Sequence, residues 1–467
     1  MNINEYVKEN EKNIIDTISD LISFKSVSEE TGNLEKPFGE ECKKALDYAL
    51  ELGQKMGFRT KNIDGYCGYI EFGEGEELVG IIGHLDVVPA HFEDGWTKDP
   101  FVADIRDGKL FGRGSIDDKG PVVASLYAMK YVADNMKVNK RVRLILGLNE
   151  EKDWKCINHY KEVEEAPTIG FSPDADFPAI YAEKGILSLE IANKFDLDGF
   201  EILDMDTNGN ALNVVPKYAS IKIKHIGSGE VPSFEDEENI KVINLGENEF
   251  KIEATGVASH AAFPSNGKNA ITILFKYLLK YIKSDYIQTL MHLGIFEIES
   301  PEFLSRQDIA YATEFHEVSV VQDESGILTS NIADIKYEDG ILKIRLNLRI
   351  PVKTPIDDII LQYKKLSNIF EELEISVLGR QEPLYVDKES FLVTKLLDIY
   401  NKVTCTKKDA IAIGGGTYAR AFPNCIAYGV TMPGEPDMCH QVDEFIKLDN
   451  LFLACKIYCE AIYELAK

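Results

Sequence analysis

The chain has 467 residues, of which 78 are Asp or Glu and 51 are Lys or Arg, so its formal net charge is −27. This charge repels nucleic acid and anionic membrane surfaces. It therefore excludes a function that depends on binding along the phosphate backbone of a nucleic acid. The chain is also too long for one hydrophobic core, which predicts two domains.

The N-terminal segment is polar and lacks the apolar core of a signal peptide. No apolar run approaches the roughly 18 residues that indicate a membrane span. The eight cysteines include no Cys-x-x-Cys pair, and Cys455 and Cys459, four residues apart, are interpreted as core residues of one helix. These features predict a cytoplasmic protein with reduced thiols.

The first predicted elements are two amphipathic helices over residues 3–25 and 39–56, where apolar side chains recur at helical spacing. The unbroken apolar run 78–83 is typical of a buried parallel strand. It ends in His84-Leu-Asp86, and residues two apart on a strand share a side. We therefore expect Asp86 to accept a hydrogen bond from the His84 ring, as the partner of a metal-ligating histidine does.

A glycine-rich loop that carries Asp117 precedes a predicted helix over residues 122–132. The next predicted strand, 141–148, runs directly into Glu150 and Glu151. Strand, loop, helix and strand form a right-handed α/β unit, and sites in such sheets lie at the carboxyl ends of the strands. The histidine and both glutamates fall at such ends.

From about residue 186 the strands alternate apolar and polar residues, as in 342–349, which indicates a sheet covered on one face only. We predict an α/β fold in which the first domain, residues 1–184 and 382–467, has a mostly parallel sheet sandwiched by helices. The second domain, residues 185–381, is predicted to be an inserted α+β domain.

Several acidic residues occupy sharp turns or strand ends, and two histidines occupy comparable settings. Converging carboxylates cannot all ionise unless cations neutralise them. Two divalent metals that share one bridging carboxylate, roughly 3.5–4 Å apart, satisfy this condition. One carboxylate must stay off the metals to accept a proton from water, and adjacent residues such as Glu150 and Glu151 point in opposite directions. The residues concerned are His84, Asp117, Asp118, Glu150, Glu151, Asp174 and His440.

These motifs resemble a known family. His84-x-Asp86, Gly-Arg-Gly-x-x-Asp117-Asp-Lys-Gly, Glu150-Glu151, Ser-Pro-Asp174-Ala and Cys-His440 are similar to motifs of the co-catalytic two-metal metallopeptidases, which include aminoacylases, succinyl-diaminopimelate desuccinylase and carnosinases. The segments 171–178, 154–156 and 414–420 and the large insert resemble most closely the bacterial dipeptidase PepV subgroup. The resemblance covers nearly the whole chain.

The resemblance implies that Asp117 bridges the two metals and has a cis peptide bond to Asp118. One metal would take His84 and Asp174, and the other Glu151 and His440. The same resemblance makes Glu150 the general base and gives Asp86 the task of orienting His84.

The resemblance also makes the inserted domain a lid, in which His260 stabilises the oxyanion and Asn213 and Arg349 hold the substrate. Without it, His260 would be an ordinary loop histidine and Arg349 a surface arginine. The run Gly414-Gly-Gly416 lacks the Lys-Ser/Thr of a phosphate-binding loop. Gly415, Gly416 and Thr417 are instead interpreted as donors to a substrate carboxylate or oxyanion.

The chain departs from the family pattern around two of these residues. Asn149 precedes the glutamate pair where Asp is usual, and Lys152-Asp153 replaces small residues after it. Cys439 stands before His440 where PepV-like proteins often have Met. A thiolate ligand at Cys439 is an alternative, although neighbours on a loop seldom both ligate a metal.

We predict a monomeric dipeptidase that hydrolyses small dipeptides with a free N-terminus through a metal-bound hydroxide, without nucleic-acid or membrane partners. The cofactors would be two divalent metals, zinc first, with manganese or cobalt equally suited to His, Asp and Glu ligands. The alternatives are an N-acyl-amino-acid deacylase on the same site and a non-catalytic small-molecule binder. The intact Glu150 argues against a binder, which needs ligands but no base.

Overall fold

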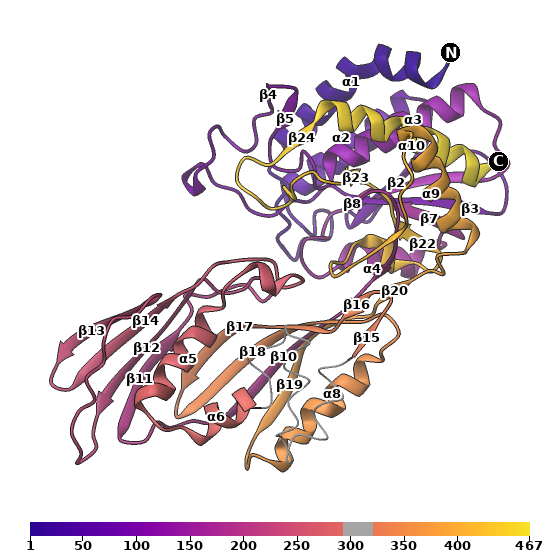
Figure 1. Cartoon of the computed structure of the whole chain (residues 1–467). Coiled ribbons are helices and arrows are strands. Elements are labelled where there is room, and N and C mark those ends of the chain that lie inside the picture. Colours follow the sequence, from indigo (N-terminus) through magenta and orange to yellow (C-terminus); the bar gives the residue numbers. More distant parts are fainter. Residues whose placement is uncertain (293–320) are drawn as a thin grey trace. The chain divides into compact units, whose positions relative to one another are not determined.

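The structure is a computed structural model that describes residues 1–292 and 321–467 (Figure 1). Within these ranges the chain forms two compact units, each with its own core. No helix in the described ranges is both long enough and apolar enough to cross a membrane. Unit 1 comprises Met1–Ala182, Leu384–Ile411 and Gly416–Lys467, and unit 2 comprises Glu183–Pro383 and Ala412–Gly415.

The main sheet of unit 1 is mixed, with strand order β1-β2-β6-β3-β7-β22-β9-β20 and β21 beside β9. Its centre, β6-β3-β7-β22, is parallel, whereas β1, β2 and β9 pair antiparallel with their neighbours. The predicted mostly parallel sheet is thus correct for the centre and wrong for the edge, where the short turn between β1 and β2 permits only antiparallel pairing. The bounds are β1 Arg59–Ile63, β2 Cys67–Phe72, β3 Leu78–His84, β6 Arg141–Gly147, β7 Ile169–Ser172, β9 Ile180–Glu183, β20 Leu384–Tyr385, β21 Ile411–Ile413 and β22 Cys425–Ala427.

Helices cover both faces of this sheet, as predicted. On β2, Ile70 lies directly under Gly53 of α2, while the adjacent Glu71 binds Arg143, which also donates to the Tyr160 hydroxyl of α4. Successive residues of a strand point to opposite faces, so α2 and α4 lie on opposite sides. The helices of unit 1 are α1 Ile3–Ser23, α2 Glu40–Lys55, α3 Lys119–Asn135, α4 Lys155–Val163, α9 Phe391–Thr404 and α10 Leu448–Ala466.

Short elements of unit 1 connect the loops around the carboxyl edge of the sheet. The chain from β23 to β24 contains His440, and β24 pairs with β5. Strand β8 follows Asp174 and pairs with β23. These elements are β4 Asp104–Arg106, β5 Lys109–Phe111, β8 Ala175–Asp176, β23 Val430–Thr431, β24 Phe445–Lys447 and the 3₁₀ turns η1 Phe92–Asp94 and η5 Tyr418–Ala421.

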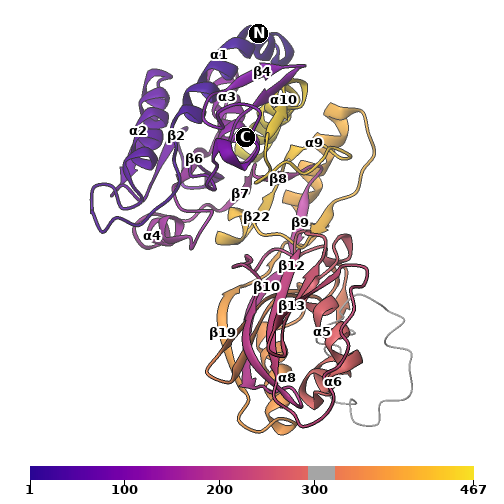
Figure 2. The same ribbon diagram turned by 90° about the vertical axis from the view of Figure 1, so that its left-hand side faces the viewer.

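Unit 2 contains two four-stranded antiparallel sheets, β17-β18-β10-β19 and β11-β12-β14-β13. Helix α5 contacts strands of both sheets (Figure 2). The elements are β10 Gly185–Lys194, β11 Phe200–Asp206, β12 Tyr218–His225, β13 Ile240–Gly246, β14 Glu249–Thr255, β15 Gln322–Asp323, β16 Gly326–Ile327, β17 Thr329–Glu338, β18 Ile341–Ile350, β19 Glu374–Gln381, α5 Ala270–Tyr281, α6 Asp285–His292, α8 Ile356–Lys364, η2 Pro264–Asn266 and η4 Lys365–Asn368.

Residues 412–415 belong to unit 2, although the sequence predicted them in the first domain. The Lys184 amide donates a hydrogen bond of 3.0 Å to the Ile413 carbonyl. The Arg349 guanidinium donates to the Gly414 carbonyl at 2.9 Å. These bonds fix a returning segment that the sequence pattern alone does not associate with unit 2.

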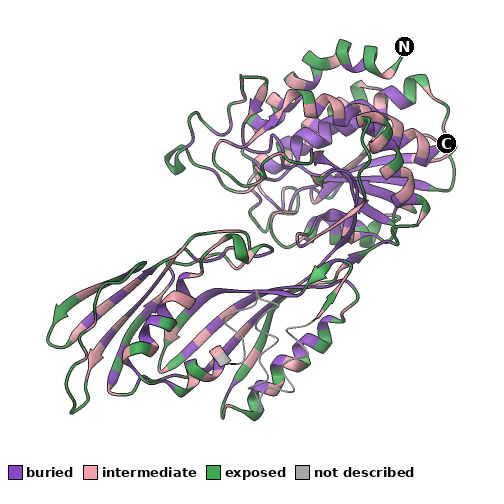
Figure 3. Cartoon of the chain, in the orientation of Figure 1, coloured by how far each residue is buried: buried purple, intermediate pink, exposed green. Residues whose placement is uncertain are grey.

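Burial along the first half of β18 alternates as predicted, whereas every residue in the second half of the strand is buried (Figure 3). Leu342, Leu346 and Leu348 are fully buried, as their period of two predicts. On the other face, Asn347 and Arg349 are also buried, each with 3% of its surface exposed. The end of β18 is therefore covered on both faces, which a solvated charged face would not be.

The core of unit 2 can be tested by a cavity at Leu346, whose cluster of apolar neighbours lies wholly between residues 187 and 373. Leu346→Ala should destabilise this unit by about 2–5 kcal/mol, while Leu346→Met should cost less than about 1.5 kcal/mol. Hydrogen exchange should then show faster opening of β10 and β18 in the alanine variant, with β3 and β6 unchanged. Equal loss of protection in β3 would contradict independent cores.

Candidate active site

Three parallel neighbours place the first site residues on one edge of the sheet. Strand β3 ends at His84, β6 is followed by Glu150 and Glu151, and β7 is followed by Asp174. Because β6, β3 and β7 are adjacent and parallel, their carboxyl ends meet at the same edge. The folding of three buried strands thus gathers these four side chains.

Two loops complete the cluster with Asp117 and His440. Asp117 lies in the turn that leads into α3, and its peptide bond to Asp118 is cis, as the resemblance implies. His440 adopts a left-handed backbone conformation with φ of 65°, which is uncommon for a residue with a side chain. Such a conformation persists where surrounding contacts determine it.

Asp117 lies between two imidazoles. The Nε2 atom of His84 lies 3.0 Å from Oδ1 of Asp117 and 3.5 Å from Oδ2 of Asp174. The Nε2 atom of His440 lies 3.1 Å from Oδ2 of Asp117 and 3.0 Å from Oε2 of Glu151. The five predicted ligands therefore form two groups that share Asp117, in the division that the resemblance implies.

The His84 ring contacts Asp86, as predicted, but its partner is the main-chain carbonyl of Asp86 and not the predicted carboxylate. Its Nδ1 atom lies 2.9 Å from the main-chain carbonyl oxygen of Asp86, while the carboxylate of Asp86 is 3.5 Å away. That carboxylate instead accepts the amides of Glu150 and Glu151, each at 3.1 Å. Asp86 therefore supports the ring through its main chain and holds the glutamate turn through its side chain.

The partner of Nδ1 also shows that this nitrogen of His84 carries a proton. A carbonyl oxygen only accepts, so Nδ1 donates, and in the neutral ring Nε2 presents a lone pair toward Asp117 and Asp174. The buried Nε2 makes no hydrogen bond within the described residues, although Asp117 Oδ1 is only 3.0 Å away. Two facing lone pairs at this distance require a positive charge between them, which either a proton on Nε2 or a cation supplies.

The pKa values of the carboxylates in the cluster also indicate that a positive charge is required there. Burial raises the pKa of Glu150 well above its ordinary value, and the charges of Glu151, Asp174 and Asp117 raise it further against the opposing effect of His84. Burial and the charge of Asp117 raise the pKa of Glu151 to about 7. Burial and Asp117 likewise raise the pKa of Asp174. The carboxylates oppose one another's ionisation.

The two imidazoles respond in the opposite direction. Burial opposes protonation of His84, but contacts with Asp117, Asp174 and Asp86 hold its pKa well above the ordinary value. The same balance raises the pKa of His440 to about 11, through Asp117 and Glu151. Despite burial, the two imidazoles hold the pKa of Asp117 far below its ordinary value.

These residues fit divalent cations. A cation relieves the repulsion among the carboxylates and satisfies the lone pair of His84. One ligand atom from each of His84, Asp117 and Glu151 also lies within 4.8 Å of the others, which shows that the two groups meet at Asp117. Burial and the charge of Asp117 raise the pKa of the neighbouring Cys439 thiol well above its ordinary value.

In unit 2, backbone pairing brings Asn213 and His260 together. The segments around them form a β-bridge between Val214 and His260, and the Ala261 amide donates to the Asn213 carbonyl at 2.8 Å. The Nδ1 atom of His260 accepts the amide of Ala262 at 3.1 Å. The proton of a neutral His260 ring is therefore on Nε2, which makes that nitrogen a donor.

Arg349 approaches the same loop through Gly414. Its Nη1 donates to the Gly414 carbonyl at 2.9 Å, and its Nε donates to Asn347 at 3.0 Å. A Cβ atom on Gly414 would lie 2.9 Å from the Cβ of Ala262, so only glycine permits this approach. The predicted substrate residues Asn213, His260 and Arg349 thus lie around one loop of unit 2.

The remaining predicted residues lie where the chain passes from one unit to the other. Gly415 ends the returning segment of unit 2, and Gly416 begins the last part of unit 1. The hydroxyl of Thr417 accepts the amide of Ala419 at 3.1 Å and caps η5. This contact gives Thr417 a local structural role.

A residue that the sequence did not reveal is Tyr418, which follows this cap. Its ring lies edge-on to His84 at 6.1 Å between centroids, and its hydroxyl lies 2.6 Å from the Cys156 sulfur. Cys156 and Tyr418 lie in the segments 154–156 and 414–420 that resemble the PepV subgroup, but no spacing rule links them to His84.

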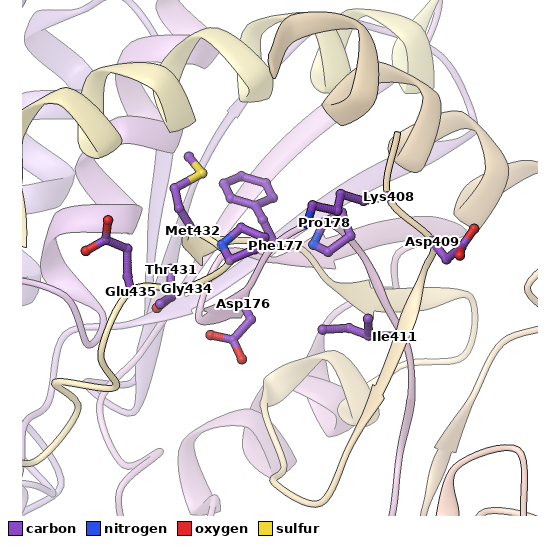
Figure 4. A pocket seen from close by; sticks show the side chains of 11 residues that line it. Asp176, Phe177, Pro178, Lys408, Asp409, Ile411, Thr431, Met432, Gly434 and Glu435 are labelled. Atoms are coloured by element: carbon purple, nitrogen blue, oxygen red, sulfur yellow. The ribbon is translucent and has the colours of Figure 1, made fainter. Parts of the chain in front are cut away.

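A cavity of about 380 Å³ lies beside β8 (Figure 4). Burial and the charge of Asp437 raise the pKa of Asp176, on its wall, to about 6. None of the predicted metal ligands lines it, so this hollow is separate from the ligand cluster. Its walls are formed by Asp176, Phe177, Pro178, Lys408, Asp409, Ile411, Thr431, Met432, Pro433, Gly434 and Glu435.

The chain is similar over its full length to curated dipeptidases. It is 37% identical to the putative dipeptidase YtjP of Bacillus subtilis (strain 168), over 99% of both chains. It is 34% identical to the Beta-Ala-Xaa dipeptidase of Lactobacillus delbrueckii subsp. lactis, over 100% of this chain and 99% of that protein.

Solved structures share the fold at lower identity. Human carnosine dipeptidase 1 covers 99% of this chain and 98% of its own, with a TM-score of 0.61 and 17% identity. The dipeptidase Dug1p of Saccharomyces cerevisiae has a TM-score of 0.58 and 13% identity, over 99% and 98% of the two chains.

The family comparison agrees with the motifs. Residues 80–464, which include all five predicted metal ligands, match the family described as Peptidase family M20/M25/M40. The resemblance drawn from the sequence is therefore confirmed, and this chain belongs to the M20/M25/M40 family of metallopeptidases.

Proposed function

We propose that the protein is a metal-dependent dipeptidase that hydrolyses dipeptides with a free N-terminus. The observation that carries this proposal is the cluster in which Asp117 lies between His84 and His440, while the half-buried carboxylate of Glu150 makes no ion pair with an imidazole in the described cluster. Relatives named as dipeptidases that match over the whole chain support the substrate class.

Two divalent cations would be held by the two groups that share Asp117. His84 and Asp174 would complete one position, and Glu151 and His440 the other. We propose zinc, and manganese or cobalt would also suit these ligands. Bound cations would supply electrostatic stabilisation of the carbonyl oxygen and would lower the pKa of the attacking water.

Glu150 would be the general base. Its amide is fixed by the Asp86 carboxylate at 3.1 Å, so the turn that carries it is held in place. Glu150 would accept the proton of the attacking water and then donate it to the leaving amine. A base in this position contributes about 10²–10⁴-fold to the rate.

Unit 2 would act as a lid that supplies groups for the substrate. The Nε2–H of His260 would donate to the developing oxyanion. Arg349 would bind the C-terminal carboxylate, since a guanidinium suits two-point recognition of that group. Asn213, Gly415, Gly416 and Thr417 would donate further hydrogen bonds to the substrate.

We also propose that the protein is cytoplasmic and monomeric. All eight cysteines are free, which suits a reducing compartment. The proposed lid would complete the site within one chain, without a partner subunit.

The roles of the adjacent glutamates can be separated by metal content. Glu151→Gln should lower metal occupancy, because it removes a charged ligand oxygen beside His440. Glu150→Gln is the matched control and should retain the wild-type metal content. Elemental analysis of both variants after desalting tests this assignment, and equal contents or the reverse order would contradict it.

The substrate class is tested by comparing free and N-acetylated dipeptides as substrates. Hydrolysis should be confined to the free peptides, should disappear on chelation and should return when a single divalent metal is added. Glu150→Gln should lose about 10²–10⁴-fold in kcat with metal still bound. Preferred cleavage of N-acyl amino acids would replace the dipeptidase proposal with a deacylase.

Arg349 is tested by the C-terminus of the substrate. A hydrogen bond to a charged group contributes about 1.5–3 kcal/mol, so wild type should favour a free-acid dipeptide over its amide by about 10- to 150-fold in kcat/KM. Arg349→Met should abolish that preference. Arg345→Met, on the same strand but paired with Glu190 and Asp334, is the control and should retain it. An unchanged preference in Arg349→Met would exclude the proposed role.

A further inference from the structure

Glu444 is a fully buried carboxylate that binds the loop leading to Asp117. Its Oε2 accepts from Arg113 Nη1 at 2.7 Å and from the Gly114 amide at 3.1 Å. Its Oε1 accepts from the amides of Ile116 at 2.9 Å and Asp117 at 3.3 Å. The Ser115 hydroxyl also donates to Oε1 at 3.5 Å, so one carboxylate fixes five donors of a single turn.

Arg113 makes the reciprocal contact with the loop of His440. It is 4% exposed, and its second amino group donates to the His440 carbonyl at 3.3 Å. The Gly112 amide donates to the Glu444 carbonyl at 3.0 Å. The centre of the Trp96 ring lies 5.2 Å from the guanidinium carbon of Arg113, and the ring helps to enclose this group.

These contacts join two segments that are far apart in the sequence, since Arg113 and Glu444 are separated by 331 positions. Each segment carries one proposed ligand of the same cation position. Asp117 is in the first, and its main-chain amide is bound directly. His440 is in the second, and its main-chain carbonyl is bound directly.

We infer that Arg113 and Glu444 are a positioning pair that sets the distance between Asp117 and His440, and thereby the affinity of the cation position formed by Asp117, Glu151 and His440. The inference rests on the two-cation site of the proposed function. The other position shares Asp117, but its remaining ligands are His84, at the end of β3, and Asp174, two residues after β7, and neither of these is in a loop that the pair holds. It should depend far less on the pair.

A purely structural role would have a different signature. Removing one partner of a buried ion pair is strongly destabilising, whatever the pair's function. General loss of stability would weaken both cation positions together. A positioning role weakens one position selectively, so cation affinity at the two positions separates the two roles.

The test is Glu444→Gln, which retains the side-chain volume and removes the charge. Apo-protein is titrated with Zn²⁺ against a chromophoric chelator to obtain both dissociation constants. One constant should rise by about 10–100-fold, the usual effect of removing a partner that orients a ligand. The other should change by less than about threefold.

Combining Glu444→Gln with a variant that already lacks one ligand identifies which cation position is weakened. In Asp174→Asn, where the remaining tight position is that of His440, Glu444→Gln should weaken Zn²⁺ binding by about 10–100-fold. In Glu151→Gln, where the remaining tight position is that of His84, Glu444→Gln should have little effect. This difference in coupling does not depend on the absolute stability of either variant.

Asp443→Asn is the matched control, since it makes the same chemical change one residue earlier. Asp443 accepts from Thr97 and has no contact with the Asp117 loop in the described structure. It should leave both constants unchanged. Arg113→Lys, which keeps the charge but loses the two-armed contact, should weaken the same position as Glu444→Gln, and it decides the question if Glu444→Gln does not fold.

Equal weakening of both positions, or of neither, would overturn the inference. So would selective weakening of the position of His84. Because the readout is Zn²⁺ affinity, the result is independent of dipeptide hydrolysis. A wild-type protein that binds two ions without cleaving dipeptides would refute the proposed function and leave this inference standing.

Discussion

Repulsion among buried carboxylates is the constraint on which the rest of unit 1 depends. The fold separates these groups into two kinds. Asp86 and Glu444 accept hydrogen bonds from main-chain amides and so fix the turns that carry the predicted ligands. Asp117, Glu151 and Asp174 face imidazoles, with oxygen and nitrogen atoms about 3.0–3.5 Å apart. Asp86 and Glu444 therefore hold the turns on which the carboxylates facing the imidazoles converge, and bound cations would relieve the repulsion among those carboxylates.

The sequence predicted those parts of the site that local patterns determine. Buried parallel strands are recognisable from unbroken apolar runs, so the placement of His84, Glu150 and Glu151 at one sheet edge followed directly. The hydrogen-bond partner of the Asp86 carboxylate was missed, because a period of two shows which side a residue faces but not which donor reaches it. The predicted cis bond came from the resemblance, not from the pattern.

Contacts between segments that are far apart in the chain could not be predicted from the sequence. The alternation of β18 correctly placed Leu342 and Leu346 inside, yet it could not show that Arg349 is buried by the returning segment at Gly414. Nor could any spacing associate Arg113 with Glu444. Both failures have one cause: pairing between remote segments is determined by tertiary packing, which leaves no periodic signature.

The separation of 331 positions between Arg113 and Glu444 has a consequence for how the protein is made. Synthesis proceeds from the N-terminus, and early domains fold as they emerge from the ribosome. A nascent chain can form β3, β6 and β7 and display His84, but it cannot complete the cation cluster until His440 and Glu444 have been added. Peptide-cleaving capacity would therefore arise only after both segments have been made, and shorter nascent chains would remain inert toward the peptides around them.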